Sequence, residues 1–191
     1  MTTEKMTVHK ALAELKTMDA RIEKAIRDTT YVLAVKHSAE KINGMPVANF
    51  KEKMRSGYQK VTDLIARRNA MKRAVVLSNA NTKVKVGDKE MTVAEAIEQK
   101  NHGMEFRSEL LRQISSAYAL AQKELDRNSG ETLEKKALRK TYIENNTYDL
   151  VDPLDVTKIM EELDAEINEF NAEVDAALSV SNALTVIEFE Y

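Results

Sequence analysis

The fold is decided by residues 152–177, which read DPLDVTKIMEELDAEINEFNAEVDAA. Apolar residues recur there in alternating four- and three-residue steps, at Val156, Met160, Leu163, Ile167, Phe170, Val174 and Ala177. This spacing is that of a coiled-coil seam of about three heptads. Asp152 is a good helix cap and Pro153 suits a first helical position, so we expect the helix to open at this pair. A helix with such a seam needs a partner helix.

Working outward, the sequence predicts three further amphipathic helices. One begins after a Thr7 cap, a second runs from about residue 46 to residue 77, and a third begins after Thr92 and ends near residue 128. Gly103 weakens the middle of the third helix. Only 5 Gly and 2 Pro occur in 191 residues, which favours long helices with short connections.

Short strands are expected between the helices. Thr82–Val86 and Lys89–Met91 alternate around Gly87-Asp88, a two-residue turn, and this pattern predicts a β-hairpin. A strand is also expected at the C-terminus, in Leu184–Tyr191. Three other short strands are predicted, at Tyr31–Val35, Thr141–Ile143 and Tyr148–Val151.

The predicted fold class is therefore mainly α: a long-helix bundle of about four helices with coiled-coil-like packing, a small β-hairpin and short strands. We expect a single domain, 1–191. A weak internal sequence repeat allows a second domain organisation, because Thr7–Leu12 and Thr92–Ile97 share the pattern Thr-Val-x-x-Ala-aliphatic. In that case the chain would contain two helix–strand–helix halves, 1–80 and 81–191.

Charge is divided unevenly along the chain, although the net charge is only −2. Residues 143–191 hold thirteen acidic residues and one basic residue, Lys158, so the preceding part carries the positive charge. A basic face is predicted on the second helix, made of Lys51, Lys53, Arg55, Lys60, Arg67, Arg68, Lys72 and Arg73. Three interpretations stay open: neutralisation by the acidic last helix within one bundle, head-to-tail contact between subunits, and a nucleic-acid surface.

Edge strands are natural docking sites, because their unpaired backbone groups seek a partner. The predicted hairpin and C-terminal strand therefore supply candidate contacts for an oligomer or another partner. These candidates are Val84, Val86, Val186, Phe189 and Tyr191.

No local pattern indicates catalysis. The chain has no Cys, its three His residues are far apart, and its glycines are isolated, so thiol chemistry, a spaced metal site and a phosphate-binding loop are disfavoured. We predict no enzyme activity, no metal and no cofactor. A signal peptide and a membrane span are not expected either, and the predicted location is cytoplasmic or within a virion.

The region from Arg67 to Leu111 resembles the septicolysin-like family. The features that carry the resemblance are a basic helix end, the Val-rich hairpin, a Thr92-x-x-Glu95 helix start and the run Arg107–Leu111. The resemblance resumes at 148–160 and covers about half of the chain. It implies a small helical protein of the kind found in bacteria and phages, but no established activity or site residues.

The chain departs from that family at its C-terminus. An alternating strand stands where an Asn-Trp-containing tail is expected, and the sequence contains no Trp. One family member is labelled a possible toxin, which makes membrane activity a third functional hypothesis. The chain has no strongly apolar amphipathic stretch to support it.

The function predicted first is a non-enzymatic structural or assembly protein that forms a homo-oligomer, with a phage virion as the most specific setting. Its partners would be itself and other virion or assembly proteins. The alternative is a nucleic-acid-binding protein that uses the basic helix 51–73.

Overall fold

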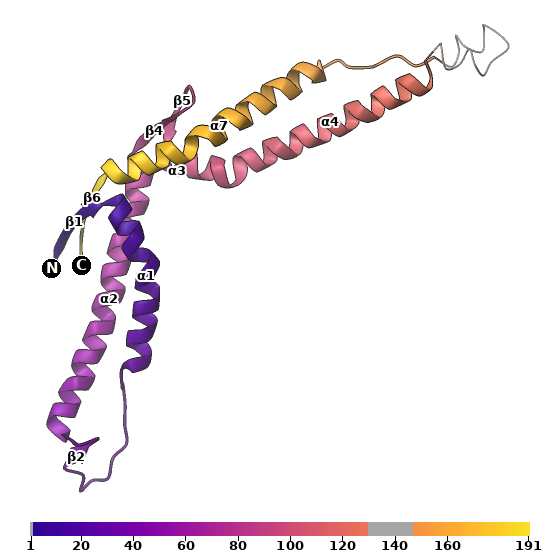
Figure 1. Ribbon diagram of the computed structural model, residues 1–191. Helices are drawn as coiled ribbons and strands as arrows, with labels where there is room; N and C mark the ends of the chain where they lie inside the picture. The colour runs from indigo at the N-terminus through magenta and orange to yellow at the C-terminus, as the bar shows by residue number, and fades with distance from the viewer. Residues whose placement is uncertain (1, 130–146) are drawn as a thin grey trace. The chain divides into compact units, whose positions relative to one another are not determined.

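The computed structural model describes residues 2–129 and 147–191 (Figure 1). The chain is mainly α-helical with short antiparallel strand pairs, which confirms the predicted fold class. It divides into two compact units. Unit 1 contains the described residues of Met1–Lys85 together with Glu90–Ala94 and Ala176–Tyr191; unit 2 contains Val86–Lys89 and the described residues of Glu95–Asp175. Both ends of the chain therefore belong to unit 1.

Unit 1 is built on two helices that lie side by side, α1 (Val8–Asp28) and α2 (Val47–Asn81) (Figure 1). α1 begins where predicted, because the Thr7 Oγ1 accepts a hydrogen bond from the Lys10 N–H at 3.2 Å. α2 follows Pro46 and continues beyond its predicted end. Apolar stripes of the two helices form the core, in which Met18 and Met71 are fully buried.

A two-stranded antiparallel sheet, β1 (Thr3–Thr7) paired with β6 (Val186–Glu190), covers this core. Met6 lies opposite Ile187, and both are buried together with Phe189. The C-terminal strand is as predicted. β1 was not predicted, because Met6 is its only apolar residue and local pattern does not reveal its partner.

The connection between α1 and α2 corrects one prediction. Tyr31–Val35 forms no strand, and Val32 is 86% exposed. Strand propensity reflects packing against a neighbouring strand, and no described strand pairs with this segment. A turn at Asn43-Gly44, with φ of 46° and 80°, joins β2 (Lys41–Ile42) to β3 (Met45–Pro46).

The predicted hairpin is confirmed as β4 (Lys83–Val86) and β5 (Lys89–Thr92). The helix after it is not continuous: α3 (Val93–Glu98) passes through a π-helical turn, η1 (Gln99–Gly103), into α4 (Met104–Arg127). The π turn ends at Gly103, which the sequence marks as the weak point of this helix.

In unit 2, α4 lies beside α7 (Val156–Leu184), whose last residues enter unit 1 (Figure 1). The Ser115 Oγ of α4 contacts the Met160 Sδ of α7 at 3.3 Å. The seam predicted from the sequence is the least exposed face of α7, with Phe170 and Val174 at 6% and 1% exposure.

The start of α7 differs from the prediction. The helix begins at Val156 rather than at Asp152-Pro153, because the Asp152 carboxylate accepts the Val156 N–H at 3.0 Å from outside the helix. Tyr148–Val151 has no strand structure, which corrects that prediction, and the predicted strand Thr141–Ile143 lies outside the described residues.

Candidate functional site

The predicted basic face does not behave as one surface, because its residues have different surroundings. The C-terminal half of α2 contributes Arg67 and Arg68, which form ion pairs with β1 and α1. The N-terminal half contributes Lys51, Lys53 and Lys60, which have no ion-pair partner among the described residues. Arg67 and Arg68 therefore serve the fold, whereas Lys51, Lys53 and Lys60 are open to a ligand or partner. Arg55 forms an exposed ion pair with Glu52, and Lys72 and Arg73 are exposed and form no ion pair with the described residues.

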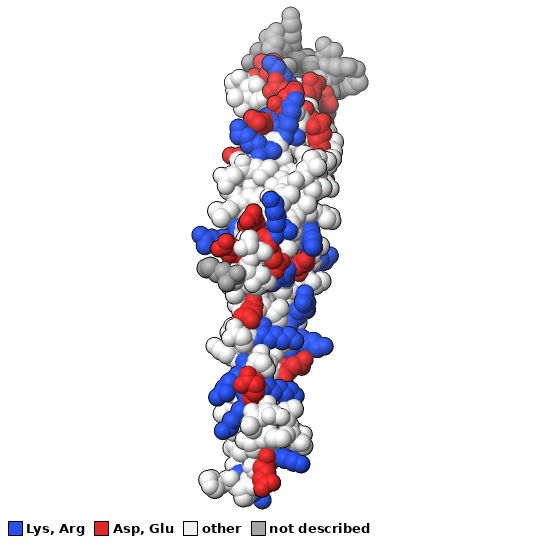
Figure 2. Space-filling model, turned by 90° about the vertical axis from the view of Figure 1, so that its left-hand side faces the viewer, with Lys and Arg blue, Asp and Glu red and all other residues white. Residues whose placement is uncertain are grey.

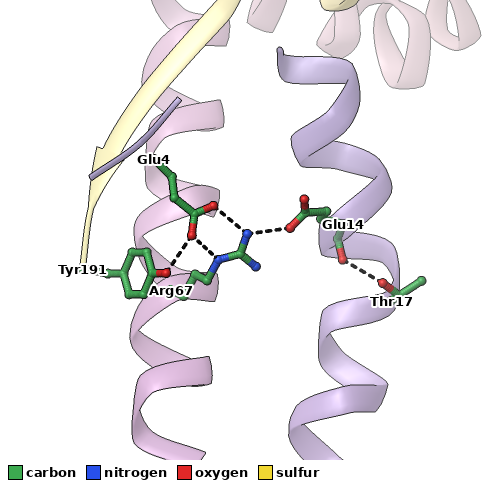
Figure 3. Close-up of polar contacts among 5 residues, drawn as sticks. All are labelled: Glu4, Glu14, Thr17, Arg67 and Tyr191. Carbon is green, nitrogen blue, oxygen red and sulfur yellow. Dashed lines mark hydrogen bonds and ion pairs between the residues drawn. The ribbon is translucent and has the colours of Figure 1, made fainter. Parts of the chain in front are cut away.

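Arg67 is the centre of a polar cluster that joins three elements and the C-terminus (Figure 3). Its Nε and Nη2 donate to the two carboxylate oxygens of Glu4 at 2.6 and 2.7 Å, and Nη2 also donates to the Glu14 Oε2 at 2.7 Å. The Tyr191 hydroxyl donates to the Glu4 Oε1 at 2.6 Å. The Arg67 side chain is only 18% exposed, so these charges are shielded in part from water.

This cluster shifts the pKa values of Glu4, Tyr191 and Arg67, the last of which its two carboxylate partners raise further. The Arg67 hydrogen bonds, with help from that of Tyr191, hold the pKa of Glu4 at about 2 despite the opposing effect of burial. The same carboxylate raises the pKa of Tyr191, because the hydroxyl donates to a negative charge. Both effects stabilise ionised Glu4 and neutral Tyr191, the forms in which these side chains hold β1, α2 and the C-terminal residue together.

Arg68 makes a second, more exposed connection between the helices. Its Nε donates to the Asp19 Oδ1 at 2.7 Å, and the two side chains are 35% and 61% exposed. This hydrogen bond lowers the pKa of Asp19. The basic face is thus neutralised in part by acids of β1 and α1.

A groove of about 680 Å³ lies between the C-terminal part of α1 and the N-terminal half of α2. Four basic side chains and one acidic side chain line it, together with apolar residues such as Phe50. The charged members are Arg21, Lys24, Lys53, Lys60 and Asp28. The excess of positive charge makes the groove suitable for an anionic ligand.

A second depression, of about 500 Å³, lies on the same part of α2 and combines basic and aromatic groups. Lys51 and Arg55 line it with Tyr31 and Tyr58, which are 49% and 58% exposed. On the face in Figure 2, the lower part, which belongs to unit 1, carries more Lys and Arg than Asp and Glu. Acidic side chains interrupt this positive surface.

Most of the five strand residues predicted to contact a partner are instead engaged within the fold. Val84, Val86 and Phe189 are buried, and Tyr191 bonds to Glu4, so these four side chains contribute to the fold. Val186 alone among them is exposed, at 50%. The pairing of β6 with β1 occurs within one chain and explains why Phe189 points into the core.

A larger exposed apolar surface, on α4, was not predicted. Phe106, Leu110 and Leu120 are 74%, 50% and 63% exposed, and Met104 is the only buried residue of this 24-residue helix. The signal was present in the sequence, because these residues form a second apolar stripe beside the one that faces α7.

The described residues include no group of three or more His, Asp or Glu side chains arranged to hold a metal ion. None of the described helices combines the length and apolar composition that a membrane span needs. No protein-family model, curated protein or solved structure matches the chain.

Proposed function

We propose that the protein is a non-enzymatic structural or assembly protein that functions as a homo-oligomer. The observation that carries the proposal is the exposure of large apolar side chains on α4, where 24 residues include one buried residue. A layer of two helices covers only one side of each helix, and a mainly apolar stripe that remains exposed is typical of an interaction surface. A phage virion is the most specific setting that we propose for such an assembly, on the basis of the family resemblance.

Unit 1 supports the same proposal. Val76 and Leu77, near the end of α2, are each 53% exposed, and Leu12 on α1 is 40% exposed. Isolated exposed apolar residues are normal, but both units here show several of them on helices that are otherwise amphipathic.

The experiment that tests the proposal is the molar mass in solution, measured by light scattering after size exclusion from low to high micromolar concentration. We expect a defined oligomer. Dissociation at high salt would place charge pairs between subunits, and persistence at high salt would indicate an apolar interface. A monomer at every concentration would contradict the proposal.

A second candidate function is nucleic-acid binding, and the groove between α1 and α2 favours it. Lysines that lack ion pairs, next to exposed Tyr31 and Tyr58, offer both phosphate contacts and stacking surfaces. Binding of a labelled oligonucleotide at about 50 mM salt, weakening steeply as salt rises, is the expected result. Lys53→Glu with Lys60→Glu should abolish it, whereas Arg73→Glu, on the same helix but outside the groove, should retain most of it.

A further inference from the structure

Helix α4 has two apolar stripes, and only one of them faces α7. The contacts of Arg107 with Glu166 at 2.9 Å and of Ser115 with Met160 at 3.3 Å identify the side toward α7. On that side lie Met104, Leu111, Ile114, Tyr118 and Leu125, which are buried or half-buried. The second stripe consists of Phe106, Leu110, Ala117 and Leu120, all of them exposed. At 100° per residue, it lies roughly 110° around the helix from the first.

The second stripe has the spacing of a coiled-coil seam. Phe106, Gln113 and Leu120 recur every seven residues, and Leu110 and Ala117 fall between them at the other seam position. Gln113 is the one polar member, and its Nε2 donates to Glu109 on its own helix at 2.8 Å. A polar residue in such a seam fixes register and orientation, at some cost in stability. The stripe is therefore suited to one particular alignment with another helix.

We infer that this stripe packs antiparallel against the same stripe of a second copy, with Leu110 of each copy facing Leu120 of the other. This inference deepens the proposed homo-oligomer by naming its interface. In this alignment each Gln113 faces a small Ala117 across the seam, which leaves room for the amide. The two Gln113–Ala117 pairs lie at the centre of the interface, and a Leu110–Leu120 layer lies on each side of them.

Charge selects the antiparallel alignment over the parallel one. Glu109 flanks the seam on one side, and Lys123 flanks it on the same side two heptads later. At 1.5 Å per residue, Glu109 of one copy and Lys123 of the other come within roughly 3 Å of the same height in the antiparallel alignment. A parallel pair would instead place Glu109 beside Ile114 of the second copy and bring the two Gln113 side chains together. Lys123 has no ion-pair partner among the described residues, so it can join the exposed ion pair that Glu109 already makes with Arg112 at 2.7 Å on its own helix.

The absence of Cys in the chain makes a cross-linking test direct. Leu110→Cys and Leu120→Cys are prepared as separate variants, and both positions are exposed in one copy, so the fold should persist. Under mild oxidation, an equimolar mixture of the two should form a disulfide-linked dimer containing one of each, and neither variant alone should do so. Self-linking of each variant alone would show parallel packing and overturn the inference.

A second measurement uses charge to break the seam. Leu110→Lys with Leu120→Lys should weaken self-association by about 100-fold or more, because the four leucines that form the two apolar layers of the dimer are replaced by buried charge. Ala119→Lys adds a charge on an exposed face of α4 away from both stripes and should leave association unchanged. Circular dichroism of each variant checks that the helices are intact.

The outcomes separate this inference from the proposed function. If the wild-type chain is oligomeric and the double-lysine variant is equally so, the α4 interface is wrong while the homo-oligomer stands. If the wild-type chain is monomeric at all concentrations, both are wrong. Mixture-specific cross-linking together with dissociation of the lysine variant supports both.

Discussion

Arg67 donates two hydrogen bonds to the carboxylate of Glu4, at 2.6 and 2.7 Å, across 63 residues of sequence. The guanidinium is planar and matches the two carboxylate oxygens at once, which makes such a pair stronger than a single ionic contact. It connects β1 to α2, and through Tyr191 it also attaches the C-terminus. The stability of unit 1 should therefore depend on this pair.

Acid should weaken unit 1 through Glu4. Its pKa in the folded chain is about 2, below the ordinary value of 4.5. Ionised Glu4 thus contributes stability above about pH 4.5, and this contribution is lost as pH falls from 4.5 toward 2. Glu4→Gln should lower the free energy of unfolding near neutral pH by about 1–2 kcal/mol, allowing for partial exposure, and the difference from wild type should shrink at pH 3.

Urea unfolding followed by circular dichroism at the two pH values measures this effect. Glu161→Gln, on an exposed part of α7, is the matched control and should change stability little at either pH. An equal loss at pH 7 and pH 3 for Glu4→Gln would mean that the charge of Glu4 is not what stabilises the fold.

Lysine at position 67 should not restore the stability that Arg67 provides. Arg67→Lys keeps the positive charge but loses the paired donors, and one ammonium cannot reproduce the bonds to both Glu4 and Glu14. We expect a loss of about 1–3 kcal/mol in the free energy of unfolding. Arg55→Lys, whose pair with Glu52 is exposed and 3.5 Å long, should cost less than about 0.5 kcal/mol. Equal effects of the two changes would contradict a special role for Arg67.

The C-terminal strand should be required for the core of unit 1. Phe189 is 6% exposed and packs in the core with Met6 and Ile187, so Phe189→Ala should cost about 3–5 kcal/mol in thermal or urea unfolding. Val186→Ala, on the same strand at 50% exposure, should cost less than about 1 kcal/mol. A small effect at Phe189 would show that β6 does not contribute to the stability of unit 1.

Gly87 should tolerate a side chain less well than Gly44. Both have positive φ, 57° and 80°, so alanine strains the backbone at each position by about 1 kcal/mol. A Cβ at Gly87 would also lie 2.6 Å from the Glu169 Oε1, whereas nothing lies within 4 Å at Gly44. Gly87→Ala should therefore lower the melting temperature more than Gly44→Ala. The Glu169 side chain is flexible and can move, so the difference between the two variants should be small but measurable.

Local signals predicted the elements whose cause lies within a few residues. The Thr7 cap, the Gly87 turn and the seam of α7 are set by side chains that are neighbours in sequence, and the structure confirms each of them. The same kind of signal failed at Tyr31–Val35, because a strand needs a partner and none is present among the described residues.

For the candidate site, the sequence predicted which residues are basic but not what surrounds each of them. The eight basic residues of α2 are evident in the sequence, but whether each is engaged or open depends on what α1 and β1 place beside it. Arg67 faces two carboxylates and Lys53 lines a groove, although both belong to the same helix. The exposed stripe of α4 was visible as a period in the sequence, yet its exposure follows from α7 covering only the other side.

The sequence by itself thus determined a mainly helical chain with a hairpin, a C-terminal strand and a divided charge. These follow from helix periodicity, turn chemistry and composition, which act over short distances along the chain. Tertiary structure alone decided that β6 pairs with β1, whose hydrogen-bonded residues include Thr3 and Glu190, 187 positions apart. It also decided that Glu4, Glu14 and Tyr191 gather around Arg67, because contacts between distant residues depend on how the helices and strands pack together.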